Sequence, residues 1–367
     1  MSYITAIGTA NPENILSQSA IAEFMVRVMQ LDQVNSRKLR AIFKSSGIET
    51  RHSVLDDYGK TEGFHFYSNS ADFEPFPSTE KRQATFRQHA LGLSLQAIEN
   101  LRDRHSFFDP RQITHLILVC CTGMYAPGLD IELVQKLNIP GTVQRTCITF
   151  MGCYAAFNAL KAADAFCKTD STGKVLIVCT ELCSLHFQKK TSDDNLLANA
   201  LFADGSAALL VEAIPSSAKR LRLAAFHNDL APEGSNDMAW TIGDLGFEMK
   251  LSSYVPEIIK GGIKKLTDSL LLKIDKQISD IRYFAIHPGG KKILEAIEEQ
   301  LRIGKNQNQA AYDVLRNFGN MSSPTVLFVL QKIFQGLTTD DHNEHILSFA
   351  FGPGLTLESM LLEIEMH

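Results

Sequence analysis

The sequence predicts an α/β protein, and three observations support this fold class. Short apolar runs alternate with amphipathic helical patterns through most of the chain, which is typical of helices layered on sheets. Of the 367 residues, 45% are apolar, so the chain can bury a large core as one unit or as two closely packed halves. No low-complexity tract, short repeat or Pro/Gly/Ser-rich linker interrupts the alternation.

The expected strands are the short runs rich in Val, Ile, Leu and Phe, and the expected helices are the longer runs with apolar residues three or four apart. The strands are expected at 114–120, 174–179, 207–211, 283–286, 346–351 and 356–364. The helices are expected at 18–29, 154–167, 254–272, 291–301 and 324–334.

Charge and composition exclude several classes of function. A net charge of −5 argues against nonspecific nucleic-acid binding. The chain has no apolar run of about 18 residues and no charged leader before an apolar stretch, so we expect neither a membrane span nor a signal peptide, and we expect a cytoplasmic location. Seven cysteines without a C-x-x-C pair indicate reduced thiols rather than disulfides or a metal site. Nucleotide-binding glycine motifs and a serine elbow are missing as well, so no cofactor is expected.

Three glycine-marked turns carry reactive side chains. Cys153 lies in Phe-Met-Gly-Cys-Tyr-Ala-Ala, His287 in Ala-Ile-His-Pro-Gly-Gly and Asn320 in Phe-Gly-Asn-Met-Ser-Ser-Pro. A thiol at a turn that opens a helix, beside an imidazole, is expected to have a pKa below its usual value of about 8.5. His287 and Asn320 offer N–H groups to an oxygen that gains negative charge, and asparagine cannot act as a base. The set therefore favours acyl transfer or carbon–carbon condensation over hydrolysis.

Each of these residues also has an ordinary structural interpretation. Cys153 could be a buried apolar side chain, as is expected of Cys167 and Cys179. His287 could end a strand at a turn, and Asn320 could cap the helix that follows it.

The local motifs nevertheless resemble those of the type III polyketide synthases, the chalcone synthase-like branch of the thiolase superfamily. The resemblance covers essentially the whole chain. His-Pro-Gly-Gly favours this branch over the ketoacyl synthases that start fatty-acid synthesis, in which Gln-Ala-Asn usually follows the histidine. The matching segments are 6–12, the Cys153 turn, 200–205, 287–290, 319–323 and 351–356.

The resemblance implies two similar halves stacked as a five-layered αβαβα body in a homodimer. Residues 1–220 would form the half with the nucleophile Cys153, and residues 221–367 would form the half with His287 and Asn320. Cys153 would take an acyl starter from an acyl-CoA, and the other two residues would stabilise the charge formed there and during decarboxylation of malonyl-CoA. Repeated condensation would give a small pyrone, resorcinol or related polyketide.

The family also implies roles for residues around the pocket. Phe202 and Phe247 align with gatekeeping phenylalanines, although both could be ordinary core residues. Two small threonines of the plant enzymes are replaced by His186 and Cys121. Met238 lies near a glycine that opens the chalcone synthase starter pocket, so a chalcone-forming specificity is not expected.

A basic run could bind the phosphates of CoA, although a solvated helix face is an alternative interpretation. Lys38 matches a CoA-binding lysine of the family, and Ala41 stands where an arginine is expected, so Arg40 could substitute. Lys44 and Lys292 complete the expected set.

Two rival functions remain open on the sequence alone. A single-round β-ketoacyl synthase would use the same three residues, and a noncatalytic thiolase-fold protein would only bind acyl-CoA. The starter, the number of extensions, the cyclisation mode, the pathway and the use of an acyl-carrier protein as donor are left open.

Overall fold

A computed structural model describes residues 1–105, 107–235 and 237–366, and most of its strands form one mixed sheet. The nine strands of this sheet have the order β11-β12-β13-β8-β1-β7-β6-β4-β5. Their bounds are β1 (Tyr3–Ala10), β4 (His115–Cys120), β5 (Gln144–Thr149), β6 (Lys174–Leu182), β7 (Asp204–Glu212), β8 (Lys219–Leu230), β11 (Tyr283–Ile286), β12 (His345–Gly352) and β13 (Thr356–Met366). Two separate antiparallel pairs are β2 (Asn14–Ser17) with β3 (Thr50–Ser53), and β9 (Met238–Gly243) with β10 (Gly246–Leu251).

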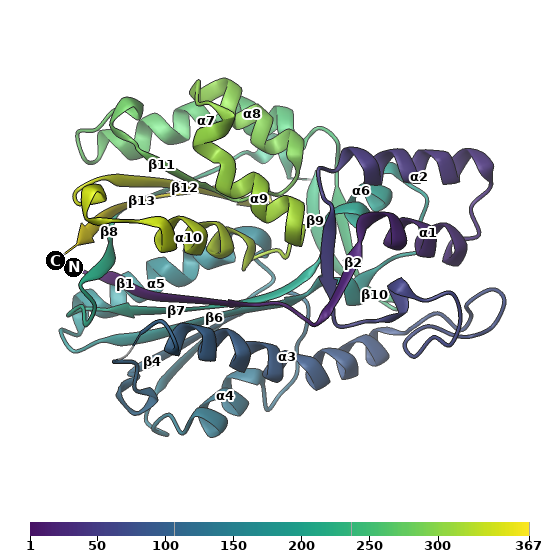
Figure 1. Ribbon diagram of the computed structural model, residues 1–367, viewed down its shortest axis with the longest axis horizontal. Coiled ribbons are helices and arrows are strands. Elements are labelled where there is room, and N and C mark those ends of the chain that lie inside the picture. Colours follow the sequence, from purple (N-terminus) through teal and green to yellow (C-terminus); the bar gives the residue numbers. More distant parts are fainter. Residues whose placement is uncertain (106, 236, 367) are drawn as a thin grey trace.

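Helices and sheet form five layers, which confirms the expected αβαβα body (Figure 1). From top to bottom in Figure 1, α7 and α8 cover β11, β12, β13 and β8; α5 and α10 lie in the middle; and β1, β7, β6 and β4 follow, with α3 and α4 below. The helices are α1 (Gln18–Val28), α2 (Gln33–Ser45), α3 (Thr79–Arg102), α4 (Leu129–Leu137), α5 (Ala155–Thr169), α6 (Asp193–Leu201), α7 (Val255–Leu272), α8 (Lys291–Leu301), α9 (Gln309–Phe318) and α10 (Thr325–Gly336).

The two parts of the sheet are joined by a short ladder between β8 and β1. These strands pair only at Tyr3 with Arg222 and at Ile4 with Leu221 within the described residues, whereas β8 pairs with β13 along nearly its whole length. The middle helix α5 is rich in alanine and buries Ala155, Ala156 and several more of these small side chains completely. Small residues allow sheet parts on both sides to approach one helix layer closely.

The expected helices and strands correspond to observed ones, but the sequence patterns missed several others. Among the missed elements are the central strand β1, the strand β8 and the long helix α3. The buried face of α3 includes the polar residues Arg82 and Ser94, which interrupt the apolar periodicity by which a helix is predicted. The expected division at residue 220 falls at the start of β8, and the two-domain assignment stays a proposal.

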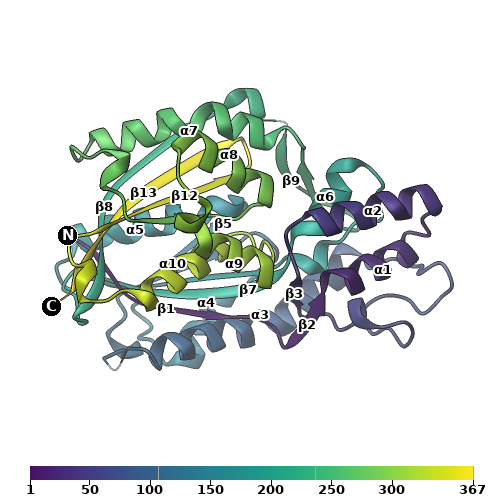
Figure 2. The same ribbon diagram turned by 45° about the horizontal axis from the view of Figure 1, so that its top comes forward.

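A group of helices extends the body at one end. In Figure 2, α1, α2 and α6 lie beyond the ends of the sheet strands, next to the β2–β3 pair. The Ser17 side chain caps α1 by accepting from the Ala20 N–H, and Asp32 caps α2 in the same way through Asn35. This end of the molecule carries one side of the site described below.

The backbone of β1 touches α3 directly at Gly8. A Cβ atom placed on Gly8 would lie 2.2 Å from the Ala97 carbonyl oxygen and 2.3 Å from the Leu101 nitrogen. Since both atoms belong to the helix backbone, a side-chain rotation cannot relieve the overlap. Glycine therefore sets the distance between α3 and the sheet.

We expect Gly8→Ala to lower the free energy of unfolding by about 3 kcal/mol or more, because α3 has to move away from β1. Gly92→Ala in the same helix is the matched control, because its added Cβ meets no atom within 4 Å. The control should raise stability by up to about 1 kcal/mol through helix propensity. Urea unfolding checks both, and equal effects of the two substitutions would contradict the close approach.

Candidate active site

Cys153 lies in a tight turn between β5 and α5. The turn Gly152–Tyr154 leads directly into the helix, so the cysteine stands at the helix entrance as expected. Gly152 has φ +74°, and a Cβ there would lie 2.6 Å from Pro353 Cδ. Its N–H donates to Cys121 Sγ at 3.1 Å. The turn that presents Cys153 thus requires glycine for both its conformation and its packing.

His287 follows the last residue of β11. Its backbone N–H donates to the Phe349 carbonyl of the neighbouring β12 at 2.8 Å, which extends the parallel pairing by one residue. The side chain is 1% exposed, and neither ring nitrogen has a hydrogen-bond partner in the described part of the chain. Unpaired buried ring nitrogens are rare in folded proteins and are typical of sites that await a ligand.

The backbone of Asn320 is held by two hydrogen bonds, and its side chain faces Cys153. Its N–H donates to the Leu201 carbonyl at 2.9 Å, and its carbonyl accepts from the Ala203 N–H at 2.9 Å. The side-chain Oδ1 accepts from the Ser322 N–H at 2.8 Å within the turn, and α10 begins only at Thr325 without a side-chain cap, so Asn320 is not the helix cap considered from sequence. The amide Nδ2 lies 4.0 Å from Cys153 Sγ, so the same side chain also faces the thiol.

One small cavity of about 20 Å³ brings the three residues together. Segments up to 167 residues apart therefore meet at one point, as the resemblance implies, while the catalytic roles remain predictions. Most of the wall is apolar. The lining consists of Gly152, Cys153, Phe202, Met238, Met249, Leu251, His287, Gly289, Ile293, Asn320, Phe351 and Pro353.

Burial keeps both the thiol and the imidazole neutral in the substrate-free site. It raises the pKa of Cys153 to about 12, although hydrogen bonds from Ser322 and Asn320 oppose the shift, and it lowers the pKa of His287 to about 3. The expected lowering of the thiol pKa is therefore wrong. Desolvation raises this pKa by more than the helix entrance and the hydrogen bonds lower it.

Glu181 connects the turns around the cavity. Its carboxylate, fully buried at the end of β6, accepts from the Cys121 N–H at 3.0 Å, from Thr122 Oγ1 at 2.7 Å and from Ser323 Oγ at 3.0 Å. Burial raises its pKa to about 7, with these hydrogen bonds opposing. Cys121 in turn accepts from Gly152, and Ser323 precedes α10, so one carboxylate holds parts of both turns. In the sequence, Glu181 stands out only as an acidic residue at the end of an apolar strand.

The predicted pocket residues fall into two groups. Phe202 and Met238 line the Cys153 cavity, whereas Cys121, His186 and Phe247 are absent from its lining. Phe247 stacks on His186 with ring centroids 4.4 Å apart, and the His186 Nε2 and Nδ1 atoms bond to the Thr122 carbonyl at 2.7 Å and to the Phe247 N–H at 2.9 Å.

Met249, two residues after Phe247 on β10, occupies the cavity wall, and no sequence motif indicated this role.

The predicted CoA-binding residues are likewise divided. Lys38 and Lys292 line an outer groove of about 310 Å³ that shares Leu251, Gly289 and Ile293 with the Cys153 cavity. Lys291, which the sequence reasoning missed, lines it too.

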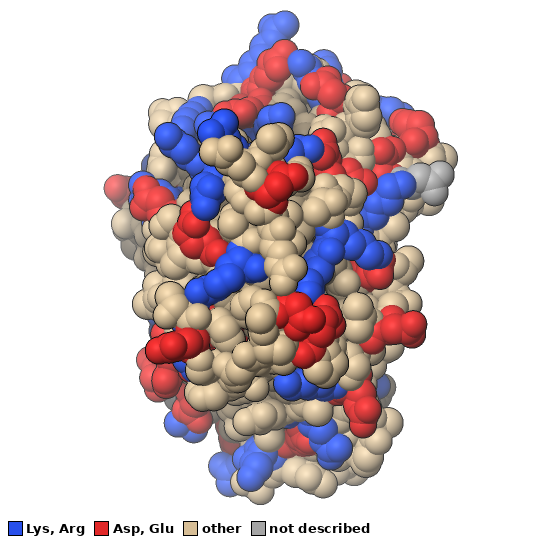
Figure 3. Space-filling view, turned by 90° about the vertical axis from the view of Figure 1, so that its right-hand side faces the viewer, with Lys and Arg blue, Asp and Glu red and all other residues tan. Residues whose placement is uncertain are grey.

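The other two basic residues lie outside the lining of this groove. Arg40 instead forms a two-pronged ion pair with Glu23, at 2.6 and 2.8 Å. Lys44 is exposed in the last turn of α2. On the end of the molecule shown in Figure 3, basic and acidic side chains are interspersed, without a large field of one sign.

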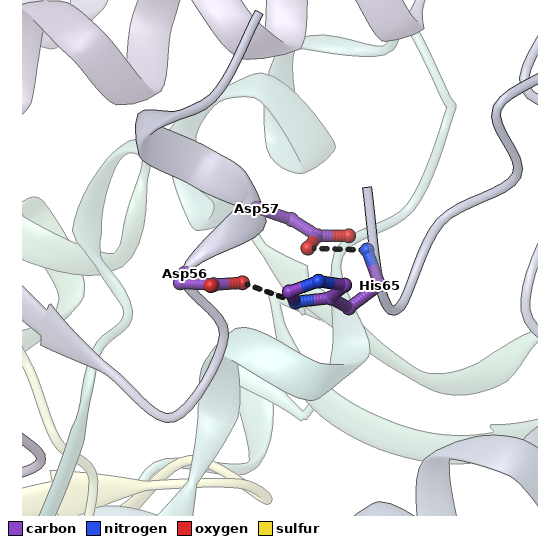
Figure 4. A group of neighbouring side chains, drawn as sticks. All are labelled: Asp56, Asp57 and His65. Carbon is purple, nitrogen blue, oxygen red and sulfur yellow. Dashed lines mark hydrogen bonds and ion pairs between the residues drawn. The ribbon is translucent and has the colours of Figure 1, made fainter. Parts of the chain in front are cut away.

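A group of Asp56, Asp57 and His65 has the spacing of metal ligands, but its atoms are already engaged (Figure 4). Asp57 accepts from the backbone N–H groups of His65, Phe66 and Tyr67 at 2.8–2.9 Å. Asp56 pairs with Lys60 at 2.7 Å and faces His65 Nδ1 at 3.4 Å. The group stabilises a loop, and nothing there points to an ion. Separately, none of the helices that the structure describes has the length and apolar character needed to cross a membrane.

Two family models match the chain along nearly its whole length. The model described as "Chalcone and stilbene synthases, N-terminal domain" matches residues 1–215, and the corresponding C-terminal model matches residues 222–365.

Curated relatives are similar over 99% of this chain. "Probable polyketide synthase 1" of Dictyostelium discoideum is 31% identical, but this chain spans only 11% of its length. "Alpha-pyrone synthesis polyketide synthase-like Pks18" of Mycobacterium tuberculosis is 30% identical, and 91% of it is covered.

Solved structures are similar as well. The C-terminal type III polyketide synthase domain of Steely1, a type I/III hybrid from Dictyostelium, has a TM-score of 0.90 and 30% identity, with 99% of each chain covered. PKS-I of the brown alga Ectocarpus siliculosus has a TM-score of 0.91 and 26% identity, with 99% of this chain and 98% of that chain covered.

The raised pKa of Glu181 predicts a pH effect on stability. The folded-state pKa of about 7 lies above the ordinary value of 4.5, so the folded state binds more protons between these pH values, and stability falls as pH rises through this window. Relative to Glu181→Gln, which does not titrate, the wild type should lose about 3 kcal/mol of unfolding free energy between pH 4.5 and pH 7.5. Urea unfolding across this range checks the difference, and parallel curves for the two proteins would refute it.

Proposed function

Because the chain belongs to the chalcone and stilbene synthase family, we propose that it acts as a type III polyketide synthase that extends an acyl-CoA starter with malonyl-CoA. The observation that carries the proposal is the meeting of Cys153, His287 and Asn320 in one apolar cavity. This set provides a nucleophile, a proton acceptor and N–H donors for an oxyanion.

The first step loads the starter on Cys153. The thiol attacks the thioester carbonyl while the neutral His287 imidazole accepts its proton. A new carbon–sulfur bond forms, the bond to CoA breaks, and the proton passes from His287 to the departing CoA thiolate. The Asn320 amide, 4.0 Å from Sγ in the empty site, donates to the carbonyl oxygen as it gains charge.

The second step uses the same donors for malonyl-CoA. Loss of CO₂ places negative charge on the thioester oxygen, and N–H groups of His287 and Asn320 hold the resulting enolate. The apolar wall, which includes Phe202 and Met238, favours the neutral CO₂ over the carboxylate. The carbanion then forms a carbon–carbon bond to the acyl carbon as the carbon–sulfur bond to Cys153 breaks, and the Cys153 thiolate leaves. This thiolate attacks the thioester of the lengthened chain and expels the CoA thiolate, which permits another round.

The outer groove with Lys38, Lys291 and Lys292 is the proposed CoA site. Its lysines can bind phosphates, and its shared wall with the Cys153 cavity gives a pantetheine arm a way inward. An acyl-carrier protein could present its arm through the same groove. Lys38 forms an ion pair with Asp193, so this pair has to open when a phosphate binds.

We also propose a homodimer joined through β5, in line with the family. This strand stands at one end of the sheet order, and Gln144, Arg145, Cys147 and Thr149 are exposed along it. Edge strands with open backbone groups readily pair with another chain. The proposed product is a pyrone, resorcinol or related polyketide, and the relative Pks18 is named for alpha-pyrone synthesis.

Cys153→Ala should abolish acyl loading and polyketide formation, because no other thiol lines the cavity among the described residues. The test is mass spectrometry of products and of acyl-protein after incubation with malonyl-CoA and acetyl-, aromatic or long-chain acyl-CoA. The wild type should give triketides or tetraketides, whereas diketides alone would indicate a single-round synthase. Full product formation by the variant would refute the nucleophile assignment.

Asn320→Ala should slow malonyl-CoA decarboxylation roughly a hundredfold or more, because one donor to the enolate is lost. Asn317→Ala is the matched control, since its backbone carbonyl, which the substitution keeps, accepts from Thr50. Release of labelled CO₂ measures the rate. An unchanged rate in the Asn320 variant would remove this residue from oxyanion stabilisation.

A further inference from the structure

A second cavity adjoins the Cys153 cavity, and Phe202 and Met249 line both. Its volume is about 40 Å³, which is room for about three water molecules or for a small polar group such as a carboxylate. Apolar side chains from α1, including Ile21 and Met25, form part of its wall, and residues of β3, α6 and the segment 183–188 form much of the rest. Because Phe202 and Met249 line both cavities, a chain attached to Cys153 would have to pass these two side chains to reach the second one.

Arg51 on β3 lines the second cavity and is only partly satisfied. The side chain is 4% exposed, and its Nη1 donates to the carbonyls of Asn199 at 2.9 Å and Phe202 at 2.6 Å. Its Nε and Nη2 atoms are buried without a hydrogen-bond partner in any described segment. A buried donor without a partner lowers the stability of the folded state, because it has lost its hydrogen bonds to water. The loss of free energy is larger for a charged group than for a neutral one.

The charge of Arg51 is not neutralised by a direct ion pair among the described residues. Asp204 acts on it only from a distance, because its carboxylate already accepts from the Val54 N–H at 2.9 Å and from Ser184 N–H and Oγ at 2.7 and 2.6 Å. Burial lowers the pKa of Arg51 to about 10, so it stays protonated at neutral pH. A buried cation in this state favours an anionic partner.

The unpaired edge of Arg51 has the geometry of a carboxylate site. Elsewhere in the chain, the same Nε and Nη2 edge binds carboxylates in a two-pronged manner, with Arg40 on Glu23 at 2.6 and 2.8 Å and Arg111 on Asp109 at 3.0 and 3.1 Å. Two parallel charge-assisted hydrogen bonds are the strongest arrangement that guanidinium makes with an oxyanion. Arg51 has this edge free.

We propose that the second cavity binds the far end of the starter and that Arg51 recognises a carboxylate there. The substrate class is an acyl-CoA with a terminal carboxylate, its methylene chain on the apolar wall and its thioester end on Cys153. The inference rests on the proposed function, because it requires acyl transfer to Cys153.

The test compares starters that differ only at the far end. Purified protein is incubated with ω-carboxyacyl-CoAs of several chain lengths and with their ω-methyl esters, and the rate of Cys153 acylation is followed by mass spectrometry. At the best length, kcat/KM for the acid should exceed that for the ester by at least about tenfold, the contribution of one charged hydrogen bond. Equal rates for acid and ester in the wild type would overturn the inference.

Arg51→Gln should abolish this preference, so that the kcat/KM values of the variant for acid and ester become equal whatever its absolute rate of acylation. Arg82→Gln is the matched control. Arg82 is equally buried and donates from Nε to the Pro77 carbonyl at 2.9 Å and from Nη1 to the Leu185 carbonyl, but it does not line the cavity. The acid preference should persist in this control.

The outcomes separate the two proposals. A preference retained by Arg51→Gln would reject recognition by Arg51. Acylation of the wild type by neutral chains without any acid preference rejects the inference and keeps the proposed function. Failure of every chain to acylate Cys153 rejects both. If Arg51→Gln does not fold, the comparison of acid and ester in the wild type still decides whether the terminal carboxylate is recognised.

Discussion

The candidate site depends on two backbone hydrogen bonds between Asn320 and the segment Leu201–Ala203. They join a turn before α10 to the chain that leaves α6, and they fix Asn320 and Phe202 relative to each other without relying on flexible side chains. The Arg51 guanidinium supports the same segment by holding the Phe202 carbonyl. Reacting groups have to be held within fractions of an ångström of their productive positions. Backbone hydrogen bonds of this kind can hold them with that precision.

The five-layered body explains why the Cys153 thiol is shielded from solvent. Cys153 begins the helix that lies between the two parts of the sheet, so protein surrounds it on most sides and its cavity is largely apolar. Exclusion of water protects an acyl thioester and a carbanion from hydrolysis and premature protonation. The same burial keeps thiol and imidazole uncharged, so charge develops only when a substrate oxygen is present to share it.

Much of the fold and the three central residues could be predicted, because turn motifs and apolar runs are local features of a sequence. The residues that were missed act through distant contacts. Glu181 is one carboxylate in an apolar strand, and only the folded chain shows that it meets both turns. The thiol pKa was misjudged for a related reason, because a local motif does not reveal how completely a side chain is desolvated. Phe247 aligned with a gatekeeper, yet its ring packs on His186 and leaves the wall to Met249.

The open edge of β5 also affects the risk of aggregation during folding. Its outer backbone N–H and C=O groups offer a template to any extended peptide, and the strand leads within a few residues to Cys153. A chain with this edge uncovered is therefore prone to misassociation close to the candidate site. In the proposed homodimer, pairing of the two copies would cover the edge before aggregation competes.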